Sequence, residues 1–124
     1  MKILTSIFLI IVLCLPLYAA ELNYESALAK SKQDESSLNS SLMQSLLEVQ
    51  GNLIGKAFMS CIRKTGMAPH DFTLVMRLNK TGEISKTWLK KRTKFTSCFT
   101  SLMETNFKFS SDRDEFYTAI EYEQ

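Results

Sequence analysis

The sequence predicts an α+β domain with a small antiparallel three-stranded sheet and two helices packed on one of its faces. Apolar residues recur at helical spacing over 40–64 and over 93–106. Apolar and polar residues alternate, as in half-buried strands, in three other segments. These alternating segments are 71–78, 83–90 and 114–123. The predicted order is therefore helix, strand, strand, helix, strand.

The first long helix is predicted from an unbroken apolar stripe. Ser40 or Ser41 is expected to cap its start, because a serine side chain accepts a bond from a free backbone N–H. Gly66 is expected to close the helix in the left-handed conformation. The stripe consists of Leu42, Leu46, Val49, Leu53, Ala57 and Cys61.

The first two strands are predicted to form a hairpin, because the turn sequence 79–82 lies between them and ends on Gly82. Thr93 is the expected cap of the second helix. The final strand is expected to pair beside the hairpin. A three-stranded sheet has two edges, and an exposed edge can accept a strand from a partner. The residues of the final strand assigned to partner binding are Phe116, Thr118, Ile120 and Tyr122.

Residues 1–20 read as a secretory signal peptide, with one lysine, an apolar run of about a dozen residues and small residues at the end. The alternative is an uncleaved membrane anchor, the only route by which we expect contact with a membrane. Residues 21–40 form a polar segment, with a short helix over 24–32 that is expected to loosen at 34–37. Residues 41–124 are predicted to be a single domain.

Two cysteines remain after the signal is removed, Cys61 and Cys98. An even pair in an exported chain predicts a disulfide, which persists in oxidising compartments such as the periplasm. The alternative is a pair of buried free thiols. The bridge, with the signal, predicts a periplasmic or secreted protein of the bacterial envelope.

The middle of the chain resembles the TonB C-terminal-like domain, in the two-cysteine variety found at the C-terminus of myxobacterial gliding-motility proteins. The resemblance covers about residues 45–123. It rests on a helix holding Cys61, the stretch Phe72–Ser85 (Phe-Thr-Leu-Val-Met-Arg-Leu-Asn-Lys-Thr-Gly-Glu-Ile-Ser), a helix holding Cys98, and Asn106-Phe-Lys-Phe. It implies a periplasmic domain that contacts another protein through a strand edge. The Pro-rich spacer typical of TonB is missing, since the chain has two prolines.

No catalytic, metal or cofactor constellation is visible. His70 is the single histidine, and a Cys–His pair would need a free thiol. Metal sites need several convergent ligands, and the glycines are too scattered for a phosphate-binding loop. We therefore expect a protein that is not an enzyme, with a small hydrolase as the least favoured class.

The middle of the chain is basic and contains a stretch of clustered cations, whereas the two ends are acidic. Its members assigned to partner binding are Lys90, Lys91, Arg92 and Lys94. Cations beside aromatic residues can bind nucleic acid, but export argues against that partner. The other interpretations are a solvated strand end or a docking patch for an acidic protein or anionic lipid. We expect an interaction module that serves an envelope assembly as an adaptor or accessory; the alternative is an inhibitor or immunity protein.

Overall fold

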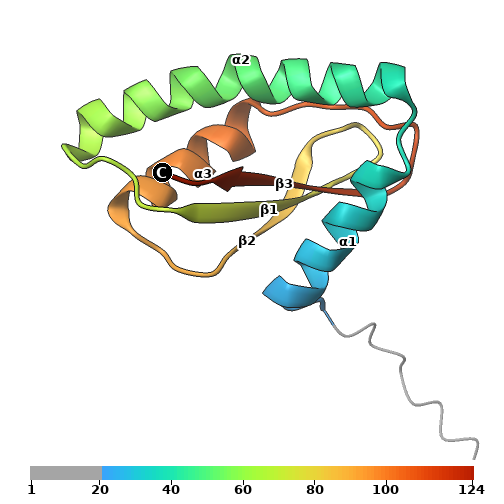
Figure 1. The fold of residues 1–124 in the computed structure, drawn as a ribbon, viewed down its shortest axis with the longest axis horizontal. Coiled ribbons are helices and arrows are strands. Elements are labelled where there is room, and N and C mark those ends of the chain that lie inside the picture. Colours follow the sequence, from blue (N-terminus) through green and yellow to red (C-terminus); the bar gives the residue numbers. More distant parts are fainter. Residues whose placement is uncertain (1–20) are drawn as a thin grey trace, which may run out of the picture.

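A three-stranded antiparallel sheet lies at the centre of the computed structural model, which describes residues 21–124 (Figure 1). The elements are α1 (Tyr24–Ser36), α2 (Ser40–Thr65), β1 (Phe72–Leu78), β2 (Ile84–Leu89), α3 (Lys94–Asn106) and β3 (Phe116–Tyr122). The predicted α+β class is confirmed, and the five predicted elements follow α1 in the expected order. The predicted signal peptide, residues 1–20, lies outside the described residues.

The strand order is β2-β1-β3, so β1 is central and pairs antiparallel with both neighbours. The turn that closes the β1–β2 hairpin needs glycine at position 82 for two reasons. Gly82 has φ +86°, and a Cβ built there would lie 2.5 Å from the carbonyl oxygen of Phe109. The N–H of Phe109 donates to the Gly82 carbonyl at 3.0 Å. The segment after α3 is thereby fixed against the hairpin turn.

Helices α2 and α3 cover one face of the sheet and enclose the main core. Asn39 caps α2, because its Oδ1 accepts the N–H of Leu42 at 2.9 Å; the prediction of Ser40 or Ser41 was wrong by one or two residues. Gly66 ends α2 with φ +65°, as predicted. The fully buried large side chains of this core are Leu46, Leu74, Met76, Leu78, Phe95, Phe99, Met103 and Phe116.

The disulfide Cys61–Cys98 joins α2 to α3 and confirms the predicted pairing. The two Cα atoms are 5.8 Å apart, and the sequence separation is 37 residues. In the chain-entropy model, closing a loop of that length destabilises the unfolded state by about 4 kcal/mol. The bridge therefore fixes the helical layer independently of the apolar core.

Helix α1 lies on the opposite face of the sheet, so the fold has three layers (Figure 1). Ala27 packs with Val75, Trp88 and Tyr117 in a second, smaller cluster. The Trp88 Nε1 donates to the carbonyl of Leu22 at 2.8 Å. The expected loosening at 34–37 was wrong, because α1 continues to Ser36. Its last turn is held by hydrogen bonds from β3.

Candidate partner-binding surface

The basic turn, defined as Lys90, Lys91, Arg92 and Lys94, connects β2 to α3, and all four side chains are exposed. None of the four forms an ion pair with an acid in residues 21–124. Unpaired cations in one short segment give a local positive potential that attracts acidic groups. The sequence prediction of a basic patch therefore corresponds to one continuous surface feature.

Local capping holds the basic turn in place. The Thr93 Oγ1 accepts the N–H of Thr96 at 3.1 Å, and the Thr96 Oγ1 accepts the N–H of Thr93 at 2.8 Å. This reciprocal capping box satisfies two donors at the start of α3. Phe95, beside the cap, is buried in the core. The turn thus has a defined backbone and presents only its charged side chains to solvent.

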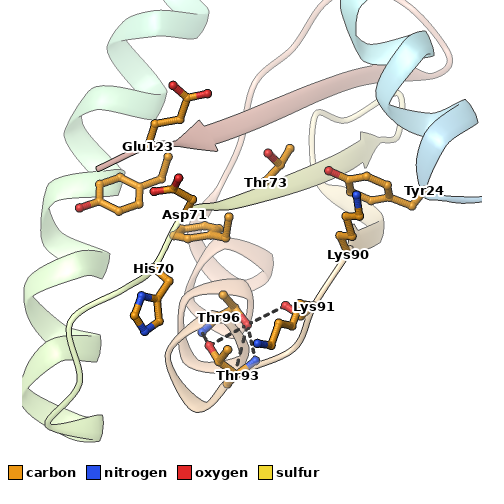
Figure 2. Close-up of a pocket in the computed structure, with 11 residues that line it drawn as sticks. Tyr24, His70, Asp71, Thr73, Lys90, Lys91, Thr93, Thr96 and Glu123 are labelled. Carbon is orange, nitrogen blue, oxygen red and sulfur yellow. Dashed lines mark hydrogen bonds between the residues drawn. The ribbon is translucent and has the colours of Figure 1, made fainter.

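A cleft of about 460 Å³ opens beside the basic turn. Figure 2 shows Lys90 and Lys91 on one side of it and His70, Asp71 and Glu123 on the other. The remaining lining residues are Tyr24, Phe72, Thr73, Thr93, Thr96 and Tyr122. The cleft therefore has lysines on one side and acids on the other, with three aromatic side chains among its lining residues.

The side chains of the final strand lie inside the fold. Phe116, Thr118 and Ile120 are buried. Tyr122 is half-buried, and its ring centroid is 4.9 Å from that of Phe58 on α2. Of the four side chains on this strand that the sequence assigned to partner binding, three are therefore buried and the fourth packs against Phe58.

The free edge of β3 is also occupied. The N–H of Tyr117 donates to the Asp34 carboxylate, and the N–H of Ala119 donates to the Glu35 carboxylate, both at 2.9 Å. The expectation of an open edge at the final strand was therefore wrong, because the last turn of α1 supplies its hydrogen-bond acceptors.

Glu35 also closes a short polar network. Its Oε1 accepts the Thr118 hydroxyl at 2.7 Å, and Gln50 of α2 donates to that hydroxyl oxygen at 3.1 Å. Two acids in the last turn of a helix oppose the helix dipole. That unfavourable placement is offset in the fold, because β3 donates hydrogen bonds to the carboxylates of Asp34 and Glu35.

A second missed contact lies on β2. Lys86 donates to the Glu21 carboxylate at 2.7 Å. This hydrogen bond and the lysine charge lower the pKa of Glu21 below its ordinary value of 4.5, with a smaller lowering from Arg77. The Lys86 Nζ also lies 5.2 Å from the centroid of the Trp88 ring. Lys86 is thus a carboxylate-binding side chain beside the basic turn.

Covalent chemistry has few candidates in the described part of the chain. Cys61 and Cys98 are joined to each other, and His70 is exposed at the cleft. Over residues 21–124, no group of three or more histidine, cysteine or acidic side chains converges as a metal site. Among these residues, no helix combines the length and apolar character needed to span a bilayer.

Comparisons with family models, curated proteins and solved structures find no match to this chain. The resemblance to the TonB C-terminal-like domain therefore stays a prediction from the residues.

Proposed function

We propose that this chain is an exported, non-enzymatic interaction module that binds another protein of the bacterial envelope, as an adaptor or accessory of an envelope assembly. The observation that carries the proposal is the basic turn, whose four cations are exposed and unpaired among residues 21–124 while its backbone is fixed by a capping box. An ordered, unneutralised patch favours an acidic partner surface.

The compartment follows from two features that support each other. The disulfide Cys61–Cys98 is consistent with an oxidising location outside the cytoplasm. The leader-like residues 1–20 support export, and the periplasm is the compartment we propose. The predicted TonB-like character supports the same kind of role, a small domain that contacts a second protein.

The test is capture of a partner by the disulfide-bonded protein, expressed from its full gene with a C-terminal tag. Cross-linked complexes are recovered from envelope extracts of the source cells. The triple charge reversal Lys90→Glu, Lys91→Glu and Arg92→Glu is expected to abolish recovery of a specific partner, because it inverts the potential of the turn.

The matched control reverses three other exposed lysines, Lys56→Glu, Lys80→Glu and Lys108→Glu, and changes the net charge equally. This control is expected to recover the partner as the wild type does. Equal recovery by both triple variants, each with its disulfide intact, would contradict the proposal.

A further inference from the structure

The two edges of the sheet differ in how their backbone groups are used. At β3, the N–H groups of Tyr117 and Ala119 point away from β1, because they bond to carboxylates of α1. Their partners on β1 are Arg77 and Val75. Backbone groups of an antiparallel strand point alternately to its two sides. Arg77 and Val75 therefore direct their N–H and C=O groups toward β2.

This alternation determines which backbone groups of β2 point toward β1 and which point outward. Val75 is paired with Trp88 and Arg77 with Lys86, so Lys86 and Trp88 exchange hydrogen bonds with β1. The N–H groups of Thr87 and Leu89 consequently point outward. Among the bonds of residues 21–124, neither N–H has a partner in a loop, a helix or a side chain. The outer edge of β2 is thus unpaired at Thr87 and Leu89 in the described chain.

The chain already pairs with the beginning of this edge. Glu83 forms an isolated antiparallel bridge with Lys108, and the N–H of Phe109 donates to the Gly82 carbonyl. This added segment ends before Ser85. The edge from Ser85 to Leu89 continues beyond it with no strand beside it in the described chain.

Two lysines on one face of this edge select the occupant, while on the other face Glu104 accepts the Thr87 hydroxyl. Lys86 and Lys90 are four residues apart, so they lie on the same face of β2 and its extension. Lys86 already binds the Glu21 carboxylate, which shows that an acid fits this position. Two copies of β2 paired through Thr87 and Leu89 would place Lys86 opposite Lys90, and opposed like charges destabilise a strand pair. An acidic strand is favoured over a second copy.

We propose that the β2 edge from Ser85 to Leu89 receives an acidic extended segment of the partner protein as a fourth strand. Acids at positions i and i+4 of that segment lie beside Lys86 and Lys90, and its backbone bonds to the outward groups of Thr87 and Leu89. The inference rests on the proposed function and adds to it the binding mode and the chemistry of the partner.

The probe is the synthetic peptide Thr-Glu-Val-Thr-Val-Glu-Thr, with blocked ends. It is titrated into the isotope-labelled, disulfide-bonded protein as it is recovered after export, and binding is followed by NMR. We expect the chemical shifts of the Thr87 and Leu89 amides to change until they saturate, and hydrogen exchange at these amides to slow. A peptide with lysine in place of both glutamates is expected to bind at least about tenfold more weakly, because like charges then face each other. Backbone N-methylation of the alternate residues that face β2 is expected to abolish binding.

Two variants of Thr87 separate backbone pairing from charge. Thr87→Pro removes the outward N–H, and proline is tolerated in an edge strand where that group faces solvent. Thr87→Val keeps the N–H and loses only the hydroxyl bond to Glu104. We expect Thr87→Pro to weaken peptide binding about tenfold, the effect of one lost hydrogen bond, and Thr87→Val to leave it unchanged.

Three results would overturn the inference. The first is equal peptide affinity for wild type and Thr87→Pro, with N-methylated peptide also bound. The second is no binding of the acidic peptide. The third is self-association of the wild type by light scattering that Thr87→Pro abolishes, which assigns the edge to a second copy. If envelope-partner capture still depends on the basic turn but not on Thr87→Pro, the proposed function stands and the strand mode fails.

Discussion

Replacing Glu35 with alanine tests how α1 is held on the sheet. Glu35 accepts a backbone N–H from Ala119 at 2.9 Å and the hydroxyl of Thr118 at 2.7 Å. Bonds to a charged acceptor contribute about 1.5–3 kcal/mol each when desolvated. Glu35 is half-exposed, and Thr118 keeps its bond from Gln50. We therefore expect Glu35→Ala to lower the free energy of unfolding by about 2 kcal/mol.

The assay combines urea denaturation with native-state amide exchange. A loss of about 2 kcal/mol accelerates exchange at the Ala119 amide about 30-fold, because 1.36 kcal/mol corresponds to a factor of ten. Central-strand amides such as that of Val75, which open only with the core, are expected to accelerate by the same factor, because global unfolding also breaks the bonds of Glu35. Glu35→Gln keeps an acceptor oxygen, so its free energy of unfolding is expected to lie between those of wild type and Glu35→Ala.

Glu25→Ala is the matched control, because it removes the same charge from an exposed position in the first turn of α1. It loses only a favourable interaction with the helix dipole, less than about 1 kcal/mol. The reasoning is refuted if Glu35→Ala and Glu25→Ala unfold at the same urea concentration and the Ala119 amide exchanges at the wild-type rate.

Three further predictions concern the disulfide, the hairpin turn and an exposed ion pair. The double variant Cys61→Ala, Cys98→Ala is expected to lose about 4 kcal/mol and about 15–20 °C in Tm by calorimetry; an unchanged Tm would show that the bridge does not restrict the unfolded chain. Gly82→Ala is expected to cost more than about 2 kcal/mol, because a Cβ clashes with the Phe109 carbonyl and φ is positive; denaturation at wild-type urea concentrations would exclude that clash. Lys86 lowers the pKa of Glu21, so the stabilisation by this pair is present above pH 4.5 and is lost as pH falls through the lowered value. Glu21→Gln should therefore be less stable than wild type above pH 4.5, and the difference should shrink as pH falls below 4.5; a difference that does not change with pH would contradict the pair.

The helices and strands were predictable because their buried faces impose a period on the sequence. Leu74, Met76 and Leu78 face α2 and α3, while Val75 faces α1. Alternation of this kind is a local property, so residue order alone reveals it. The disulfide was predictable for a related reason, since the predicted signal peptide takes Cys14 with it and the two cysteines that remain allow one pairing.

The exact cap of α2 could not be predicted from local sequence preferences. Asn39, Ser40 and Ser41 are consecutive residues with similar capping preferences. Only the folded backbone shows that the Asn39 side chain accepts the N–H of Leu42. A difference of one residue in a cap has little consequence for the fold.

The end of α1 and the edge of β3 could not be predicted because they depend on contacts between distant segments. Asp34 and Tyr117 are 83 residues apart, as are Glu35 and Thr118. A polar run such as 34–37 is typical of a fraying helix when it is considered alone. The acids remain helical because β3 donates hydrogen bonds to them, so one tertiary contact overturned both the loosening and the open edge.

The sidedness of the molecule follows from the same topology. The acidic ends of the sequence meet where α1 closes β3, whereas the basic middle supplies β2 and the turn that follows it. With β1 between them, the two edges differ in their use of the backbone: N–H groups of β3 bond to carboxylates of α1, whereas the outward N–H groups of Thr87 and Leu89 have no partner in the described chain. An acidic partner is attracted to the unpaired cations of the basic turn beside β2, because long-range potentials steer encounter before any contact forms. Charge and hydrogen-bonding capacity thus favour the same edge, which is the physical basis for assigning β2 to the partner.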